Sequence, residues 1–449
     1  MTQSGRVDFD AVARAQAQLL SSRRLTTREL TAAYRTVRTA TPGAYAEQFV
    51  RALISGGYGT DDREARVVLW AEAVEAARQA LEADPRFATL LVDALKAYEW
   101  GLYDLGRRGE GLVVCEEMAL TGRRAYEAGV VHFPSYGSWE LACKLAEEGR
   151  HREAAALLGP ITRDRLIEQS GTVFWPWIAW IAELDAADAG EAARTELRAL
   201  IEHDRAKAAT GKGAMAIVIW ELLLLVDMAR AHGCVEDTDA AADQVEDLLA
   251  CLAGSAEARN SSNLLSWWTV LAALTGRRED RPAPGEPEPP VFLDLFWSPD
   301  LMRTYLGVGR ERLETEVNRL TELAADDPAE HLPHLIETQR MLKLRSIKYW
   351  ARRRRQGEEP LRSYFDDGVG FARHLNELDG VHGRPALSRA LADRAGLSVA
   401  ANDYAVALAD FREARQVIAE HAMSEAAATA AADRDGTRDR APAPARRSA

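Results

Sequence analysis

Residues 61–85 read DDREARVVLWAEAVEAARQALEADP, and this stretch shows what kind of element the chain is built from. The acidic pair Asp61-Asp62 can cap the start of a helix, and Pro85 can close its end. Between them, apolar side chains recur at intervals that place them on one helical face, namely Val67, Leu69, Trp70, Val74, Ala77 and Leu81. We therefore predict an amphipathic helix here, with one face packed against other helices.

Similar helical patterns follow one another along most of the chain, with no convincing strand pattern between them. Short turns containing Gly, Pro or Asp separate the patterns, as expected for antiparallel helices that pack on their neighbours. The fold class is therefore predicted to be all-α. The other predicted helices cover residues 9–21, 27–38, 87–105, 111–128, 138–148, 174–187, 191–208, 215–232, 238–252, 264–274, 310–325, 328–355, 360–378, 386–395 and 400–420.

A change in composition divides this series of helices. The segment GRREDRPAPGEPEPP at 276–290 holds five prolines and two glycines, so it cannot sustain a helix or bury a core. We expect an N-terminal helical-repeat segment at 1–275, a proline-rich linker at 276–297 and a C-terminal helical-repeat segment at 298–423. The remaining residues, 424–449, are rich in Ala, Arg, Asp and Pro and are predicted to be a disordered tail.

Composition and charge argue against several classes of protein. The 56 basic and 69 acidic residues give a net charge of −13, which disfavours a chain coated in nucleic acid or held on an anionic membrane. The first residues carry charges where a secretory signal has an apolar run, and the most apolar stretch, 214–228, is too short and charged to span a bilayer. We expect a cytoplasmic protein without a membrane partner. The scarcity of lysine and the abundance of alanine suggest a GC-rich bacterial genome.

The four cysteines are widely spaced along the chain and form no CxxC pair, at positions Cys115, Cys143, Cys234 and Cys251. Small secreted domains instead carry closely spaced cysteines that pair into a disulfide framework. We therefore expect buried free thiols.

Small and aromatic residues recur in a pattern that points to internal repeats. Trp70, Ala73, Ala77, Ala80 and Pro85 form one set, and Tyr404, Ala407, Phe411 and Ala414 repeat its first three intervals. A third set lies in SWELACKLAEEGRHREAAALL at 138–158, with Leu141, Gly149 and Ala154 at the corresponding positions. Such positions let two helices approach closely, because alanine is small and the aromatic side chain fills the gap to the next pair.

These patterns resemble the tetratricopeptide repeat, in which helical hairpins stack with a period of about 34 residues. The resemblance implies a right-handed superhelix of antiparallel helix pairs, an α-solenoid. It further implies that a concave surface binds an extended or helical segment of a partner protein. Another all-helical array remains the alternative interpretation of the same residues.

Sequence motifs for catalysis or cofactor binding are scarce. The chain shows no GxSxG, no HExxH and no GxGxxG preceded by a strand, and its Gly211-Lys212 pair lacks the remaining positions of a phosphate-binding loop. His331 and His334 could bring two rings to one helical face, but Pro333 lies between them and no fourth ligand is evident. We therefore predict no catalytic residue, no cofactor and no metal site.

The strongest charge feature is RMLKLRSIKYWARRRR at 340–355, which contains eight cations and no acidic residue. On a helix its apolar residues, Met341, Leu344, Ile347 and Ala351, would face inward and its cations would spread over the exposed side. Aromatic and cationic side chains together can hold an acidic peptide or a nucleobase. The candidate partner-binding residues are Lys348, Trp350, Arg352, Arg353, Arg354 and Arg355. A solvated face paired with nearby carboxylates is the simpler alternative.

A second candidate surface is the tryptophan-rich segment FWPWIAWIAE at 174–183. Trp175, Trp177 and Trp180 stand at i, i+2 and i+5, so one helical face cannot carry all three. Aromatic residues are enriched at binding hot spots, and some of these could serve as apolar anchors in a groove. Core packing between helices is the alternative.

Three classes of function are compatible with these features. The first is a non-catalytic scaffold or adaptor that binds a protein or peptide in its groove, and the basic helix makes an acidic partner one candidate. The second is a regulatory protein that contacts nucleic acid through the basic helix, whose binding would weaken steeply with salt. The third is an accessory subunit of an enzyme, although no converging set of titratable residues supports chemistry of its own.

Overall fold

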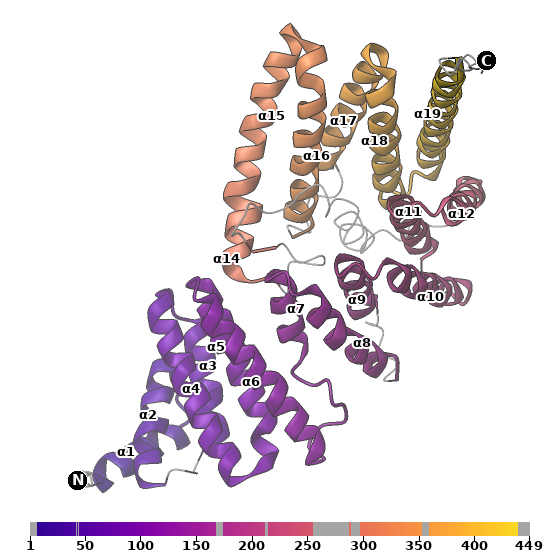
Figure 1. The fold of residues 1–449 in the computed structure, drawn as a ribbon. Helices are drawn as coiled ribbons and strands as arrows, with labels where there is room; N and C mark the ends of the chain where they lie inside the picture. The colour runs from indigo at the N-terminus through magenta and orange to yellow at the C-terminus, as the bar shows by residue number, and fades with distance from the viewer. Residues whose placement is uncertain are drawn as a thin grey trace, which may run out of the picture. The chain divides into compact units, whose positions relative to one another are not determined.

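A computed structural model describes residues 7–41, 43, 45–167, 174–211, 214–254, 287–288, 297–352 and 359–438. Every regular element in these ranges is a helix (Figure 1), which confirms the predicted all-α class. The helices are α1 Phe9–Leu20, α2 Thr27–Ala40, α3 Ala46–Tyr58, α4 Arg63–Ala83, η1 Pro85–Phe87, α5 Ala88–Asp104, α6 Arg108–Glu127, α7 Trp139–Glu147, α8 His151–Ile167, α9 Phe174–Ala186, α10 Gly190–Ala209, α11 Met215–Ala231, α12 Val235–Ala253, α14 Pro299–Met302, η2 Arg303–Val308, α15 Gly309–Asp326, α16 Pro328–Arg352, α17 Glu359–Leu378, α18 Gly380–Ala400 and α19 Tyr404–Arg438. Within the described ranges, each helix is too short or too polar to cross a bilayer.

Helix α4 forms where the quoted stretch predicts it. The Asp62 side chain accepts hydrogen bonds from the backbone N–H groups of Glu64 and Ala65, at 2.9 and 3.1 Å, which satisfies two donors at the helix start. The helix ends at Ala83, and Pro85 opens the short turn η1. The predicted boundaries are therefore confirmed by capping chemistry at both ends.

Helix α3 lies outside the helices predicted from sequence, because Gly56 and Gly57 weaken its helical pattern. Its neighbour α4 explains the second glycine. A Cβ atom at Gly57 would lie 2.2 Å from Nε1 of Trp70, so only glycine allows the two helices to come this close. The Trp70 Nε1 donates to the carbonyl of Ile54 at 3.0 Å, which fixes the contact.

The described residues fall into two compact units. Unit 1 comprises residues 1–200 and 281–305, and unit 2 comprises residues 201–280 and 306–449. This division differs from the expected one, since each unit combines residues from both sides of the proline-rich segment. Most of the predicted linker at 276–297 lies outside the described residues, so its character stays a prediction.

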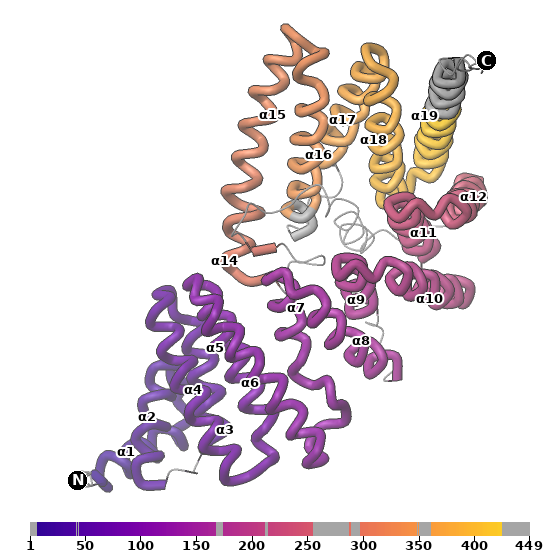
Figure 2. Tube along the Cα trace, viewed as in Figure 1, coloured from indigo at the N-terminus to yellow at the C-terminus, as the bar shows by residue number. Residues whose placement is uncertain are grey.

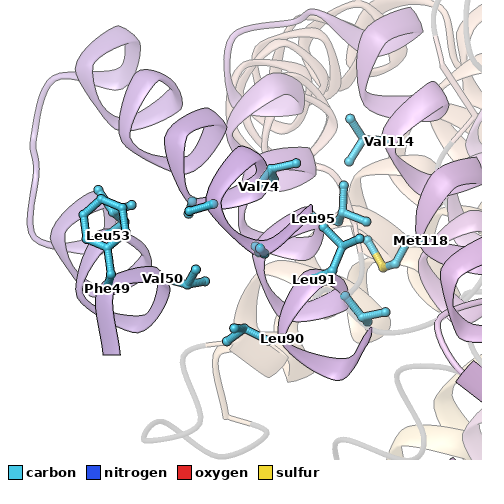
Figure 3. Packing of buried hydrophobic residues seen from close by; sticks show 14 of the residues in the cluster. Phe49, Val50, Leu53, Val74, Leu90, Leu91, Leu95, Val114 and Met118 are labelled. Atoms are coloured by element: carbon cyan, nitrogen blue, oxygen red, sulfur yellow. The ribbon is translucent and has the colours of Figure 1, made fainter. Parts of the chain in front are cut away.

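Unit 1 is a series of helices in which each packs against the next along the chain, from α1 to α9. Figure 2 traces this order by colour from indigo to magenta. The core cluster extends across α3, α4, α5 and α6, from Leu53 through Val74 and Leu91 to Met118 (Figure 3). Such consecutive packing of helix pairs is the pattern of a helical-repeat solenoid.

A short segment from beyond the proline-rich stretch completes unit 1. The backbone N–H of Ser298 donates to the Glu147 carboxylate at 3.0 Å, and Arg108 pairs with Asp300 at 3.0 Å. Arg303 also forms an ion pair with Asp104 of α5. These polar contacts attach residues 297–303 to helices α5, α6 and α7, which explains why the unit is discontinuous in sequence.

Unit 2 also contains helices that are far apart in sequence. Helices α15 to α19 pack in chain order, and α12 packs against α19. Arg415 of α19 pairs with Asp243 and Glu246 of α12 at 2.7 and 2.9 Å. Helices α11 and α12 thus belong to the same unit as the C-terminal helices, although the sequence analysis placed them in the N-terminal segment.

The C-terminal helix is longer than predicted. Helix α19 continues to Arg438, past the expected start of a disordered tail at residue 424, and residues 439–449 lie outside the described part. The sequence EAAATAAA at 425–432 accounts for the extension, because alanine has the highest intrinsic helix propensity.

The residues predicted to pack the repeats lie mostly in the interior of their units. The alanines and two aromatics among them are buried, namely Trp70, Ala73, Ala77, Ala80, Ala154, Ala407, Phe411 and Ala414. Leu141 and Tyr404 are half-buried, whereas Pro85 is exposed. Gly149 adopts a positive φ of 71° in the turn before α8, a conformation that glycine takes without strain.

Candidate functional site

Unit 2 holds a cavity of about 130 Å³ that combines an apolar interior with cationic side chains. Helices α11, α12, α16, α17, α18 and α19 all contribute to its walls. The cavity therefore depends on the packing of α11 and α12 with the C-terminal helices. No single repeat unit could form it alone.

Aromatic and aliphatic side chains form the interior of this cavity. Trp220 of α11, Phe365 of α17 and Phe411 of α19 are all buried. Leu344 and Ile347 add the apolar face of α16. The indole Nε1 of Trp220 donates to the carbonyl of Gly396 in α18 at 3.2 Å, which links α11 to α18 and leaves the ring to line the cavity.

Two cations and one carboxylate form the polar wall. Arg340 and Lys343, one helical turn apart on α16, both form ion pairs with Oδ2 of Asp393 on α18. Burial alone would raise the pKa of the Asp393 carboxyl, but the two adjacent cations and their hydrogen bonds outweigh burial and lower that pKa to about 2. Lys343 also lies 4.8 Å from the centre of the Phe365 ring, a cation–π contact.

The rim of the cavity carries further arginines. Arg230 of α11 and Arg389 of α18 line the cavity and are exposed, so the cavity reaches the surface between them. Arg415 of α19 also lines it, although that side chain already pairs with Asp243 and Glu246 of α12. Of the lining residues, five are cationic and only Asp227 and Asp393 are acidic. The cavity therefore has a positive electrostatic bias in a protein of net negative charge.

A second cavity of about 460 Å³ lies on α16, α17 and α18 of the same unit. Arg340, Lys343, Arg389 and Asp393 line both cavities. The ion-pair cluster and Arg389 therefore form a wall that the two cavities share.

The prediction for helix 340–355 was partly wrong. Leu344 and Ile347 face inward as expected, but Arg340 and Lys343 are also buried instead of lying on a solvated face. The physical reason is Asp393 of α18, which pairs with both cations and offsets part of the cost of removing them from water. No pattern near the basic helix indicates this, since Asp393 lies 53 residues after Arg340.

The other predicted contacts of the basic helix are not described by the structure. The side chains of Lys348, Trp350 and Arg352 lie outside the described part, as do Arg353, Arg354 and Arg355 altogether. Their role in partner binding stays a prediction. Sequence reasoning also missed Trp220, Arg230 and Arg389, because their helices join the cavity only through long-range packing.

The three predicted tryptophan anchors lie in unit 1, on helix α9. Trp177 is buried, and its Nε1 donates to Glu196 of α10 at 3.2 Å. Trp180 is half-buried, and its ring lies under the guanidinium of Arg163 on α8. Trp175 is half-buried against the ring of Phe174. For Trp177 this is core packing, the alternative that the sequence left open.

Unit 1 contains a second group of buried charges, centred on Lys144 of α7. Its Nζ lies 3.4 Å from Glu99 and 3.3 Å from Glu147, and all three side chains are buried. Burial opposes the charged form, but the two carboxylates outweigh it and raise the pKa of Lys144 well above its ordinary value. The two carboxylates therefore hold Lys144 in its charged form.

The four cysteines are free thiols, but only Cys115 and Cys143 are buried as predicted, whereas Cys234 is half-buried and Cys251 is exposed. Burial raises the pKa of the Cys115 and Cys143 thiols, which makes them poor nucleophiles. His151 contacts the carboxylates of Glu183 and Glu288 at 2.7 and 3.0 Å. Across the described ranges, no group of three or more metal-ligating side chains comes together, around His331 and His334 or elsewhere.

Comparisons with known proteins do not identify a family. No protein-family model and no curated protein matches the chain. A solved structure described as "Circular tandem repeat protein with novel repeat topology and enhanced subunit contact surfaces" aligns over 94% of this chain and 99% of its own, with 14% identity and a TM-score of 0.18.

Proposed function

We propose that this protein is a non-catalytic scaffold or adaptor that binds an acidic protein or peptide segment at the cavity of unit 2. The observation that carries the proposal is the combination of a buried aromatic interior with exposed arginines at the rim. Apolar pockets with a few convergent polar groups are the usual form of binding sites. A positive rim would attract an acidic partner and orient it.

We also propose the type of helical repeat and the cellular location of this scaffold. The buried small residues of α4, α8 and α19 support a tetratricopeptide-like stack of helix pairs, which would be right-handed as the sequence resemblance implies. A scaffold of this kind would act in the cytoplasm of a bacterium, as composition suggests. The basic residues Lys348, Arg352, Arg353, Arg354 and Arg355 are further candidate contacts of the same acidic partner, by their charge in the sequence.

A binding titration with the full chain tests this function. A fluorescein-labelled, glutamate-rich peptide is titrated with protein and followed by fluorescence anisotropy, beside a lysine-rich peptide and a single-stranded oligonucleotide of equal charge. We expect saturable binding of the glutamate-rich peptide, and weaker binding of the other two. Tighter binding of the oligonucleotide, with a steep salt dependence, would instead support the nucleic-acid alternative.

Charge-reversal variants locate the site. Arg230→Glu combined with Arg389→Glu changes two exposed rim residues and should weaken peptide binding about tenfold or more. The matched control is Arg312→Glu, an exposed residue of α15 that lines neither cavity described above. Equal affinity in the rim variant and the control would contradict the assignment of the cavity.

A further inference from the structure

The size of the unit 2 cavity limits what can enter it. A cavity of about 130 Å³ is slightly smaller than an engineered apolar cavity of about 150 Å³ that binds benzene. One side chain the size of leucine or a phenyl ring therefore fits the space, whereas a longer apolar segment does not. Trp220, Phe365 and Phe411 would surround such a side chain with apolar surface.

The charges around the cavity determine where acidic residues next to that side chain could bind. Arg340 and Lys343 pair with Asp393 inside the wall and are buried, so a peptide carboxylate would have to lose its water to reach them. The exposed arginines, Arg230 and Arg389, lie instead at the opening, on helices α11 and α18. We therefore expect the carboxylates of a bound peptide to contact the rim arginines, while its apolar side chain enters the cavity.

We propose that the recognised segment is a peptide with one leucine- or phenylalanine-sized side chain between acidic residues. The apolar side chain occupies the cavity, and flanking carboxylates pair with Arg230 and Arg389. This inference rests on the proposed function and names the peptide class that the scaffold binds.

The apolar anchor provides most of the affinity in this arrangement. Ion pairs between exposed side chains contribute little, because water and salt screen them. Burying one leucine-sized side chain changes affinity by about tenfold to a hundredfold. A purely acidic peptide should therefore bind much more weakly than one that carries the anchor.

The experiment compares two peptides on the full chain by fluorescence anisotropy. One has six glutamates around a central leucine, and the other has alanine in place of the leucine. We expect the leucine peptide to bind at least about tenfold more tightly to the wild type. Octanoate is the competitor that represents a free carboxylic acid with an apolar tail.

A cavity-filling variant tests where the leucine goes. Ala392 of α18 is half-buried and lines the cavity, so Ala392→Phe should occupy the space and abolish the difference between the two peptides. Ala325→Phe, at an exposed position on α15, is the matched control and should preserve that difference. Circular dichroism of both variants checks that they remain folded, and the wild-type comparison stands independently of them.

The outcomes separate this inference from the proposed function. Equal binding of both peptides, weakened by the rim variant, would overturn the anchor and leave the acidic scaffold standing. No binding of either peptide would overturn both. Displacement of the leucine peptide by octanoate at a concentration equal to the peptide's own Kd would identify a fatty-acid site and overturn the peptide assignment.

Discussion

Both units bury lysine and carboxylate side chains, but they place these charges differently. In unit 1, Lys144 lies between Glu99 and Glu147, and Glu147 also holds the backbone of Ser298. In unit 2, Arg340 and Lys343 pair with Asp393, and all three line cavities. The first group joins helices to a returning segment, whereas the second borders space that a ligand can enter.

This difference shows that a buried charge is not by itself a sign of function. A buried ion pair contributes little net stability, but removing one partner is costly because the other charge stays buried. A buried pair marks a candidate site only where the same residues border an accessible cavity. The cluster at Asp393 meets this condition, since exposed Arg230 and Arg389 open the same cavity to the surface.

The largest effect is expected from Lys144→Met in unit 1. The change leaves the buried Glu99 and Glu147 carboxylates without their shared cation and should lower the free energy of unfolding by about 3–5 kcal/mol. Chemical denaturation measures the loss. Arg51→Met is the control, because Arg51 and its partner Glu47 are 59% and 50% exposed and their pair should contribute less than about 1 kcal/mol. Similar losses in both variants would mean that the buried pairs of Lys144 stabilise the fold no more than an exposed pair does.

A smaller loss is expected from Asp393→Asn in unit 2. The amide removes the charge that compensates Arg340 and Lys343, but Asp393 is 17% exposed, so water can partly replace it. We expect destabilisation of about 2–3 kcal/mol by chemical denaturation. Asp366→Asn, which removes a 53% exposed partner of Arg394, should cost less than about 1 kcal/mol. If Asp393→Asn lowers the free energy of unfolding as much as Lys144→Met or more, then the charge cluster in unit 2 is as shielded from water as that in unit 1.

The stability of the protein should depend on pH through the same carboxylate, that of Asp393. The pKa of Asp393 falls from 3.8 to about 2 on folding, so its ionised form stabilises the folded state above about pH 4. That contribution, about 2 kcal/mol at 1.36 kcal/mol per unit, is lost as the pH falls from about 4 to about 2. The stability difference between wild type and Asp393→Asn should therefore shrink over this interval. A difference that stays constant would mean that Asp393 is not held ionised by its partners.

The sequence predicted the local features of the fold well, because they depend on neighbouring residues. Capping by Asp62, the apolar stripe of α4 and the buried alanines all follow from spacing along the chain. Helix α3 was missed since Gly57 looks like a helix breaker until Trp70 is seen to pack against it. Helical propensity thus fails where a tertiary contact requires glycine.

The candidate site could be predicted only in part. Arg340 and Lys343 were recognised as part of a basic segment, but their burial depends on Asp393, about 50 residues away. The contact between Trp220 and Gly396 spans 176 residues. Periodicity carries no information about such pairs, because it records which face of a helix is apolar and not which helix lies opposite.

The smallest effect on stability is expected from reversing the rim charges, Arg230→Glu with Arg389→Glu. Both side chains are exposed, and surface substitutions away from caps and buried networks change the free energy of unfolding by about 0.5 kcal/mol or less. Thermal denaturation should therefore find the double variant close to Arg312→Glu, while peptide binding separates the two. A loss as large as that of Asp393→Asn would mean that the rim arginines hold α11 against α18. In that case the rim would resemble the ion pairs of unit 1, because its arginines would join helices instead of meeting a ligand.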